Sequence, residues 1–237
     1  MKAMILAAGK GTRLGEITTT IPKVLVDING KSLLRLAVEK CSRYGFDDII
    51  INVHHYADQV EAEVAILSKE GFKITISDER EQLLETGGGL FKARNFFDKD
   101  PFLLYNADTV SDTDLKALYL YHVKMNGIAT LAVRNREGKR YFLVNREGIL
   151  KGWINKSTGE KIIIAGEMNA LSEIAFSGMH IIEPGIFDYM KDGIYTMTEL
   201  YLQLASSHNI YTWRDDSGNW VNVGTPDNIE TARKLFK

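Results

Sequence analysis

Five nearly continuous apolar runs, each followed by a more polar stretch, constrain what this chain can fold into. They read KAMILAA (2–8), DDIIINV (47–53), FKITIS (72–77), PFLLYN (101–106) and IATLAV (128–133). Strands that are covered on both faces of a parallel sheet have this continuous apolar character. Between the runs, apolar residues recur at helical spacing, as in 33–44 and 112–126. The alternation predicts an α/β fold with a doubly wound, mostly parallel, Rossmann-like sheet.

Glycines mark the expected helix ends. Gly45, Gly71 and Gly127 each stand between a helical stretch and the apolar start of the next strand. Glycine adopts the left-handed conformation that often follows the last residue of a helix. Within the helical stretches, Cys41 and His122 fall on the apolar stripes. We therefore predict that both are packing residues of the core.

The pattern changes after residue 134, where strand-like runs are joined by short polar turns and no helix separates them. This region predicts a small antiparallel extension of the sheet. Its expected strands are 140–145, 148–154, 160–165 and 173–182. Further along we expect helices at 184–191, 197–207 and 226–236, and strands at 209–214 and 219–223. Pro226 after Thr225 is a favourable start for the last helix.

Composition excludes several classes of function. The formal net charge is −2, which argues against a general binder of nucleic acid or of anionic membranes. The single cysteine, Cys41, excludes an internal disulfide and favours a reducing compartment. The first apolar run reaches glycine at position 9, which is too short for a signal peptide or a membrane span. We expect a cytoplasmic protein with no membrane or nucleic-acid partner.

The loop after the first apolar run has the composition of a phosphate-binding loop. It reads GKGTR (9–13) and leads to Pro22-Lys23. Glycines let backbone N–H groups point together at an anion, and Arg13 and Lys23 add positive charge. Leucine at position 14 excludes both a dinucleotide GxGxxG fingerprint and a Walker A loop. We predict that the loop binds a polyphosphate at the carboxyl end of the first strand.

Two further segments carry residues suited to a ligand. Asp108 follows the strand-like run PFLLYN, which places a carboxylate at the same sheet edge and suits a Mg²⁺ ligand. An Asx turn is the alternative for this segment, but Ser111 and Asp112 can cap the next helix without it. Three glycines at 87–89 are costly in a helix and indicate close approach of the backbone to a flat ligand.

The chain resembles the sugar-1-phosphate nucleotidyltransferases, in which GxGTR is followed by PK. The opening LAAGKGTRL…IPKVLVDINGKSLL (6–34) carries the signature in register. Four further segments follow in the order of the family, ETGGGL (85–90), YNADT (105–109), FSGMHII (176–182) and WVNVGTP (220–226). The resemblance covers essentially the full length and implies a nucleotidyltransferase fold of GT-A-like architecture. It also implies one domain, 1–237, with 1–134 mainly binding nucleotide and 135–237 mainly binding sugar phosphate.

The reaction that the resemblance implies is attack of a sugar 1-phosphate on the α-phosphorus of a nucleoside triphosphate. The attacking phosphate needs no general base, because its second pKa is about 6. By resemblance, Arg13, Lys23 and Asp108 are catalytic, and Asp108 and Asn222 are the metal ligands for Mg²⁺. The implied nucleotide-binding residues are Leu6, Ala7, Ala8, Gly9, Gly11, Thr12, Arg13, Lys23, Gln82, Gly87, Gly88 and Asn106. The implied substrate residues are Lys156, Glu173, Ser177, Gly178 and Glu199.

Two positions depart from the family pattern. Lys156 is not part of the usual Glu-Lys-Pro form. Asn222 stands where the family has an aspartate before VGTP, and a neutral amide oxygen is a poorer Mg²⁺ ligand than a carboxylate. Either the metal rests mainly on Asp108 and the phosphates, or its site is weakened, or activity is lost. Adjacent His54 and His55 point to opposite faces of a strand end and are not expected to share a metal.

INVHHYADQV (51–60) and LLETGGG (83–89) most resemble N-acetylmuramate-1-phosphate uridylyltransferases of peptidoglycan recycling. UTP with N-acetylmuramate 1-phosphate is therefore the first expectation. GTP with a mannose or heptose 1-phosphate is the second. A CTP:phosphocholine cytidylyltransferase would need an acceptor pocket lined with aromatic residues. A non-catalytic nucleotide-binding module is the alternative that Asn222 raises. A monomer and a homodimer are both compatible with the sequence.

Overall fold

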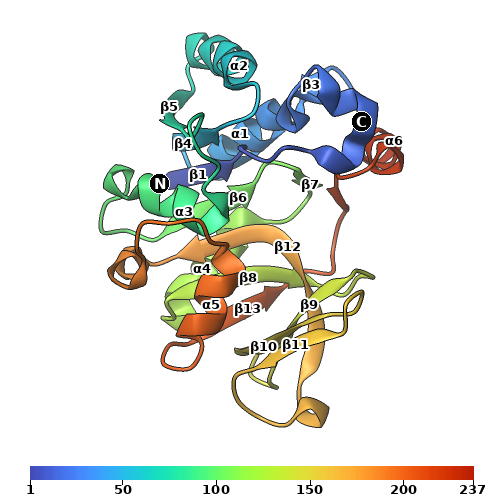
Figure 1. Ribbon diagram of the computed structural model, residues 1–237. Helices are drawn as coiled ribbons and strands as arrows, with labels where there is room; N and C mark the ends of the chain where they lie inside the picture. The colour runs from blue at the N-terminus through green and yellow to red at the C-terminus, as the bar shows by residue number, and fades with distance from the viewer.

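The computed structural model describes all 237 residues and contains one mixed sheet of ten strands (Figure 1). Five strands follow the predicted apolar runs: β1 (Lys2–Leu6), β4 (Asp48–Val53), β5 (Lys73–Asp78), β6 (Phe102–Asn106) and β8 (Ala129–Arg134). Five more come from the second half: β9 (Arg140–Val144), β10 (Leu150–Asn155), β11 (Glu160–Ile163), β12 (Ser172–Ile182) and β13 (Ile210–Arg214). The fold class is the predicted doubly wound α/β sheet with an antiparallel extension.

The strands pair in the order β11-β10-β9-β12-β6-β1-β4-β5, and β12 also pairs with β8, which pairs with β13. β1 lies between β4 and β6 and is parallel to both. β12 runs antiparallel to β6 and to β8 and lies between these two strands. Its first residues pair with β9 instead, so this one strand joins the parallel sheet to the β9–β11 extension.

Helices cover both faces of the sheet. α1 (Leu33–Arg43), α2 (Ala57–Lys69) and α4 (Leu115–Met125) bury their apolar stripes in one core cluster with β1, β4 and β6. α3 (Glu85–Lys92) and α5 (Met197–Leu204) pack into a second cluster on the other face. The burial of Cys41 and His122 is confirmed, since both are 0% exposed. His122 is also satisfied, because its ring nitrogens lie 3.0 Å from Thr130 Oγ1 and 3.1 Å from Glu183 Oε1.

Most element boundaries agree with the sequence, and two details at the ends of α4 differ. Gly45 and Gly71 have the expected left-handed φ of 82° and 102°. After α4, however, Asn126 takes the left-handed position with φ 51°, and Gly127 is required for packing instead, because a Cβ there would lie 2.6 Å from the Tyr211 ring. The expected cap at Ser111 and Asp112 is also wrong. The helix begins later, and the Asp114 side chain accepts from the N–H groups of Lys116 and Ala117.

The loop regions add short elements that the sequence did not reveal, whereas the last helix lies where it was predicted. Residues Thr12–Thr19 of the expected polar loop form a 3₁₀ segment, as do Pro184–Tyr189 where an α-helix was expected. Two small ladders join β2 (Asp27–Ile28) to β3 (Lys31–Ser32), and β7 (Thr109–Ser111) to β14 (Trp220–Asn222). α6 (Pro226–Leu235) packs against the N-terminal loop region, where Asn29 Nδ2 donates to the carbonyls of Arg233 and Phe236 (Figure 1).

No helix is long and apolar enough to cross a membrane. The longest, α2, has 13 residues and carries Asp58, Glu61 and Glu63.

Candidate active site

The GKGTR loop leaves the carboxyl end of β1, as predicted, and is fixed by its own contacts. Gly11 has φ 68°, and a Cβ there would lie 2.8 Å from Lys23 Cβ. Its carbonyl accepts from Leu14 N at 2.9 Å and from Thr18 Oγ1 at 3.1 Å. Only glycine fits this turn, because a side chain would be both strained and in collision with Lys23. The turn therefore holds the backbone of the loop directly beside Lys23.

Lys23 and Asp108 meet at the centre of the site. Lys23 Nζ lies 2.5 Å from Asp108 Oδ2, and the two side chains are 9% and 22% exposed. Asp108 follows β6, the strand beside β1, so the two carboxyl ends bring them together. A lysine this deeply buried needs a counter-charge, since an unpaired buried charge is strongly destabilising. The pair keeps one cation and one anion at the same sheet edge without a ligand.

Arg13 and Asn222 lie close to this pair around Gly224. A Cβ on Gly224 would lie 3.0 Å from an Arg13 Nη nitrogen and 2.9 Å from Asn222 Oδ1. The β7–β14 ladder pairs Asn222 with Thr109, and Val223 N donates to the Asp108 carbonyl at 2.8 Å. The predicted catalytic and metal-binding residues thus gather at one place, although their roles remain predictions.

A buried polar chain supports the other side of the loop. Asn52, at the end of β4, accepts from Ala7 N at 2.7 Å and donates to Glu79 Oε1 at 2.8 Å. Glu79 is 1% exposed and also accepts from Leu84 N. Burial raises the pKa of Glu79, and the hydrogen bonds from Asn52 and Leu84 oppose that rise. The chain fixes two loops, 7–9 and 79–84, relative to each other.

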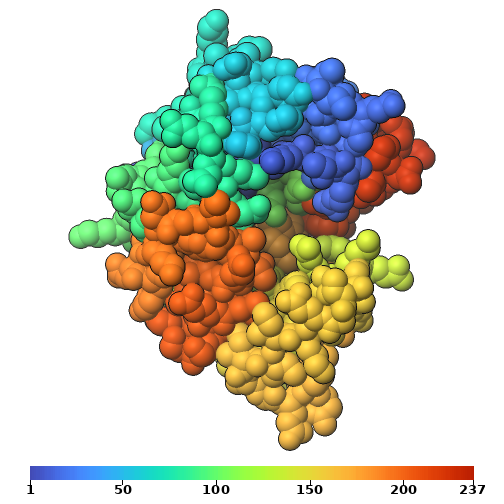
Figure 2. Space-filling model, viewed as in Figure 1, coloured from blue at the N-terminus to red at the C-terminus, as the bar shows by residue number.

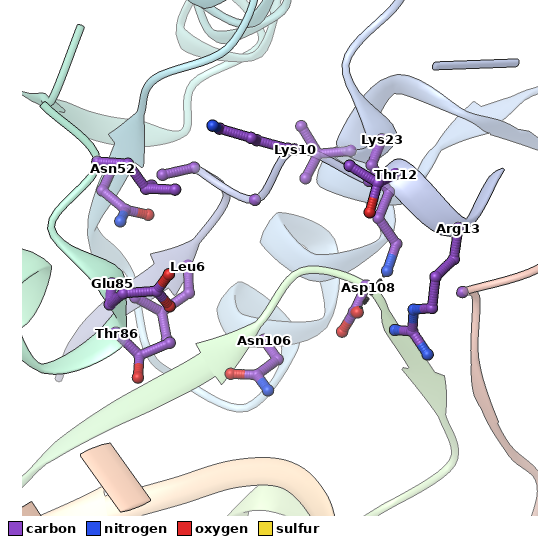
Figure 3. Close-up of a pocket in the computed structure, with 16 residues that line it drawn as sticks. Leu6, Lys10, Thr12, Arg13, Lys23, Asn52, Glu85, Thr86, Asn106 and Asp108 are labelled. Carbon is purple, nitrogen blue, oxygen red and sulfur yellow. Dashed lines mark hydrogen bonds and ion pairs between the residues drawn. The ribbon is translucent and has the colours of Figure 1, made fainter. Parts of the chain in front are cut away.

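These elements enclose a first cavity of about 430 Å³ (Figure 3). Arg13, Lys23 and Asp108 stand at one end, Leu6, Glu85 and Thr86 at the other, and Asn106 between them. The remaining lining residues are Ala8, Gly9, Lys10, Gly11, Thr12, Val24, Asn52, Leu83 and Gly224. Glu85 has a left-handed φ of 61°, a strained conformation that turns a carboxylate toward the cavity. A long cavity with cations at one end suits a triphosphate and its nucleoside.

Not every predicted nucleotide-binding residue lines this cavity. Ala7, Gln82, Gly87 and Gly88 are outside its lining. Protein contacts account for the lack of a side chain at Gly88, because a Cβ there would lie 2.1 Å from the Gly193 carbonyl, and ligand contact by Gly87 and Gly88 stays a prediction. Gly87 N and Gly88 N both donate to the Tyr195 carbonyl. The glycines therefore let α3 pack against the segment before α5.

A second cavity of about 270 Å³ adjoins the first and shares Asn106 with it. Figure 2 shows the surface hollowed where the N-terminal half, the α5 region and the β9–β11 extension meet. The lining contains two arginines and five aromatic residues but no aspartate or glutamate. Its residues are Asn106, Thr109, Arg136, Arg140, Tyr141, Phe142, Trp153, Phe176, Gly178, Thr198, Trp220 and Asn222. The cavity is therefore positively charged and lined by rings.

A bulge in β12 opens the inner wall of this second cavity. The register of β12 against β8 shifts between Phe176 and His180, and Gly178 within it has φ 87°. A Cβ on Gly178 would lie 2.5 Å from Thr109 Oγ1. The hydroxyls of Thr109 and Ser177 are buried and have no protein partner. Buried hydroxyls are nearly always hydrogen-bonded, so these two are exceptions, and they lie at the bulge that forms this wall.

The other predicted substrate residues are engaged with the protein and lie outside both linings. Lys156 forms an ion pair with Glu173, and its ammonium lies 4.9 Å from the centre of the Tyr141 ring. Glu199 completes the capping box of α5, accepting from Thr196 N at 2.5 Å and from Thr196 Oγ1 at 2.8 Å. The contacts of Glu199 are those of a helix cap.

The histidines do not form a metal centre. His54 Nδ1 lies 2.7 Å from the Glu79 carbonyl, and the His55 ring lies against the Tyr56 ring. No group of three or more His, Cys, Asp or Glu side chains is placed to hold a metal ion. Asp108 and Asn222 remain as the candidate metal ligands. The side chain of Asp108 is 22% exposed and lines the first cavity. This pair of oxygen ligands fits Mg²⁺, which commonly uses one or two protein oxygens together with water and phosphate.

Several lining residues were not found from the sequence. Asn52 could most easily have been found from the sequence, because it is a polar residue inside the apolar run DDIIINV. Arg136 and Arg140 stand in a charged connection, NREGKR, that reads as a solvated loop. Nothing in that pattern shows that the loop folds beside Trp220 and the β12 bulge.

Comparison with known proteins identifies the class. The profile of the nucleotidyl transferase family matches residues 2–237, so the chain belongs to this family. It is 31% identical to a UTP–glucose-1-phosphate uridylyltransferase of Synechocystis over 100% of this chain and 63% of that protein. It is 29% identical to the N-acetylmuramate α-1-phosphate uridylyltransferase of Neisseria meningitidis, over 99% of this chain and 98% of the relative. It is also 30% identical to a mannose-1-phosphate guanyltransferase of Yarrowia lipolytica, over 100% of this chain and 64% of that protein.

Solved structures share the same architecture. HddC from Yersinia pseudotuberculosis, complexed with GMP-PN, superimposes with a TM-score of 0.79 at 22% identity, over 100% of this chain and 99% of that one. A UDP-glucose pyrophosphorylase complexed with UDP-glucose gives a TM-score of 0.77 at 20% identity, over 99% and 97%. These likenesses show the nucleotidyltransferase fold of GT-A-like architecture that the sequence predicted.

Proposed function

We propose that this chain transfers a nucleotidyl group from a nucleoside triphosphate to a sugar 1-phosphate and releases pyrophosphate. The observation that carries the proposal is the pair of adjoining cavities that share Asn106. The first has the glycine loop, Arg13 and Lys23 at one end, and the second has Arg136 and Arg140. Two anionic substrates can therefore meet near Asp108, with cations on both sides.

The chemistry follows from bringing two anions together. A phosphate oxygen of the sugar 1-phosphate forms a bond to the α-phosphorus, and the bond from that phosphorus to the bridging oxygen breaks. No proton has to be removed, because the attacking phosphate is already largely ionised at pH 7. Arg13 and Lys23 stabilise the charge that develops on the departing pyrophosphate. The backbone N–H groups of the loop at 9–13 hold the triphosphate in line.

Asp108 and Asn222 would hold a Mg²⁺ ion, which would neutralise phosphate charge and help to orient the triphosphate. Asp108 has to divide its carboxylate between such an ion and Lys23, since Oδ2 already contacts Nζ. Asn222 contributes an amide oxygen with no net charge. The arrangement supports a metal site that depends strongly on the phosphates of the substrate.

UTP and N-acetylmuramate 1-phosphate are the first choice of substrates, which would place the protein in peptidoglycan recycling in the cytoplasm. Two N-acetylmuramate α-1-phosphate uridylyltransferases match at 29% and 28% identity over 98% and 92% of their own lengths. GTP with a mannose or heptose 1-phosphate is the second choice. A mannose-1-phosphate guanyltransferase matches at 30% identity but is spanned only over 64% of its length.

The aromatic lining of the second cavity favours a further candidate, CTP:phosphocholine cytidylyltransferase. A quaternary ammonium group binds to aromatic faces, and Tyr141, Trp153 and Trp220 are among the rings present. One of those faces is taken, however, because the Arg136 guanidinium lies 4.5 Å from the Trp220 ring. Two arginines also repel a cationic group. A sugar phosphate fits this combination better, since sugars stack on aromatic rings and their phosphates pair with arginine.

Pyrophosphate release tests the proposal. Each of UTP, GTP, CTP and TTP is combined with N-acetylmuramate 1-phosphate, mannose 1-phosphate, a heptose 1-phosphate, glucose 1-phosphate and phosphocholine. We expect turnover with a sugar 1-phosphate, highest with UTP and N-acetylmuramate 1-phosphate. The Lys23→Met variant, which lacks the cation of the ion pair, is the inactive control. Binding of a nucleotide without turnover of any pair would identify a non-catalytic module, and turnover of phosphocholine alone would identify the cytidylyltransferase.

A further inference from the structure

Two arginines in the second cavity have no acidic partner. Neither Arg136 nor Arg140 forms an ion pair, and no aspartate or glutamate lines the cavity. Arginine is charged at all accessible pH values, so the wall of the cavity carries two uncompensated positive charges. Arg136 lies in the connection before β9 and Arg140 begins β9, so the two charges are presented by different parts of the lining.

Arg136 is built into the wall on the side of Asp108. Its Nη2 donates to the Phe176 carbonyl at 3.0 Å and its Nη1 to the Glu137 carbonyl at 3.0 Å. Its guanidinium stacks on Trp220, and its Nε is buried without a partner. Trp220 belongs to β14, which pairs with β7 directly after Asp108. The third residue of β14, Asn222, pairs with Thr109, and both line the second cavity. A phosphate that meets the α-phosphorus near Asp108 therefore lies on the Arg136 side.

Arg140 is placed in the lining by the antiparallel extension. It is the first residue of β9 and pairs with Asn155 of β10, so it belongs to the antiparallel extension. Its side chain is exposed and has no hydrogen-bond partner within the protein. Lys156 of the same extension lies outside the lining and is neutralised by Glu173. Arg140 is thus an exposed charge of the lining that no acidic side chain neutralises.

We propose that the second cavity selects acceptors that carry an anionic group besides their 1-phosphate, with Arg136 binding the phosphate and Arg140 binding the second anion. The inference rests on the proposed function and narrows its substrate class to sugar phosphates with an additional acid group. A carboxylate attached to the sugar ring suits Arg140, because the guanidinium fork binds a carboxylate through two parallel hydrogen bonds.

Binding of two matched sugars tests the inference without requiring turnover. N-acetylmuramate 1-phosphate and N-acetylglucosamine 1-phosphate differ only in the lactyl ether that carries the carboxylate. Trp153 and Trp220 line the cavity, so tryptophan fluorescence reports binding there. Titrations are made with α,β-methylene-UTP present and, in parallel, with α,β-methylene-GTP, whose bridging carbon blocks pyrophosphate release. The variants are Arg140→Met, Arg136→Met and, as a matched control, Arg146→Met, an exposed arginine at the other end of β9 that lines neither cavity.

We expect the wild type and Arg146→Met to bind the muramate at least about tenfold more tightly than the glucosamine, the effect of one charged hydrogen-bonded contact. Arg140→Met should remove this preference and leave the affinity for the glucosamine unchanged. Arg136→Met should weaken both sugars. Equal affinities in the wild type, a preference that survives in Arg140→Met, or no binding of either sugar would each overturn the inference. If the wild type prefers the muramate and Arg140→Met does not, but no substrate pair is turned over, the inference stands and only the proposed function is rejected.

Discussion

Lys23 Nζ lies 2.5 Å from Asp108 Oδ2, although the two residues are 85 positions apart in the chain. The contact arises because β1 and β6 are parallel neighbours whose carboxyl ends meet at one sheet edge. An incoming triphosphate therefore meets a lysine that is already paired, and it competes with Asp108 for that charge. The same carboxylate is the charged oxygen ligand that we propose for a metal at this end of the cavity.

Replacing Asp108 tests both of its contacts. We expect Asp108→Asn to lower turnover by about a hundredfold or more, because the neutral amide loses the charged metal ligand and the partner of Lys23. Asp48→Asn is the matched control, since Asp48 is paired with Lys73 at the opposite end of the sheet and should keep full activity. Turnover is measured across a magnesium titration, with circular dichroism to check the fold. Full activity of folded Asp108→Asn at low magnesium would show that the metal is held elsewhere.

Arg13→Ala should reduce kcat more than it weakens substrate binding. The guanidinium lies beside Gly224 in the first cavity, where the proposed reaction would develop charge on the leaving pyrophosphate. Losing one such electrostatic contact typically costs about 3 kcal/mol, or about a hundredfold in rate. Arg13→Lys should recover part of the loss because it restores the charge without the fork. Steady-state kinetics that show near wild-type kcat for Arg13→Ala would remove Arg13 from the mechanism.

The glycines at 87–89 make a prediction about stability. A Cβ on Gly88 would lie 2.1 Å from the Gly193 carbonyl, so Gly88→Ala must push α3 away from the segment before α5. Overpacking of this kind typically costs about 1–3 kcal/mol. Gly185→Ala is the control, because nothing lies within 4 Å of its Cβ position. Chemical denaturation should show a clear loss for Gly88→Ala alone. Equal stability of the two variants would mean that the packing at Gly88 is loose.

His180 predicts a pH dependence of stability. It is buried under Phe176 and hydrogen-bonded to Tyr201 at 2.8 Å, and burial lowers the pKa of His180 to about 3. The unfolded chain, with a histidine pKa of about 6.5, binds the proton more readily, so stability falls as the pH drops below that value. Between about pH 7 and pH 5 this residue should cost about 2 kcal/mol of unfolding free energy. His180→Gln, which cannot titrate, should lack this part of the decline; parallel curves for the two proteins would contradict the assignment.

The sequence predicted the layers of the fold but not the place of β12. Strand identity follows from apolar runs such as PFLLYN, because burial on both faces leaves a local trace in the sequence. Strand order has no such trace. β12 inserts between β6 and β8 through pairings such as Met179 with Tyr105, and both partners read as ordinary buried residues. The start of α4 was misjudged for a similar reason, since Asp112 and Asp114 are equally good caps in sequence and tertiary contacts decide between them.

The residues of the site likewise divide into those that the sequence could single out and those that it could not. The position of the GKGTR loop beside the first cavity could be predicted, because glycines and cations at fixed spacing have a direct physical use around a phosphate. Arg136 and Arg140 could not, because their importance depends on where the β8–β9 connection folds. Gly87 and Gly88 were assigned to ligand contact, whereas the structure gives their space to Tyr195 and Gly193. A glycine in a sequence indicates that another group comes close to the backbone, but it does not identify that group.

Asn222 gives the last prediction, because its amide oxygen stands where a second charged ligand would strengthen a metal site. The β7–β14 ladder pairs Asn222 with Thr109, next to Asp108, and its Oδ1 lies 2.9 Å from the Cβ position of Gly224. An Arg13 nitrogen lies 3.0 Å from the same point. A carboxylate introduced here thus has two partners to choose from, a magnesium ion shared with Asp108 or the Arg13 guanidinium.

The two choices give opposite results for Asn222→Asp. If the new carboxylate binds magnesium, half-maximal activity should be reached at a lower magnesium concentration, because charged oxygens are the preferred protein ligands of this ion. Direct titration with Mn²⁺ in the presence of nucleotide should show the same tightening. If it pairs with Arg13 instead, kcat should fall at saturating magnesium, since the cation is withdrawn from the leaving pyrophosphate. Superimposable magnesium and manganese curves for Asn222→Asp and the wild type would exclude a metal-ligand role and leave residue 222 as a structural residue at the end of β14.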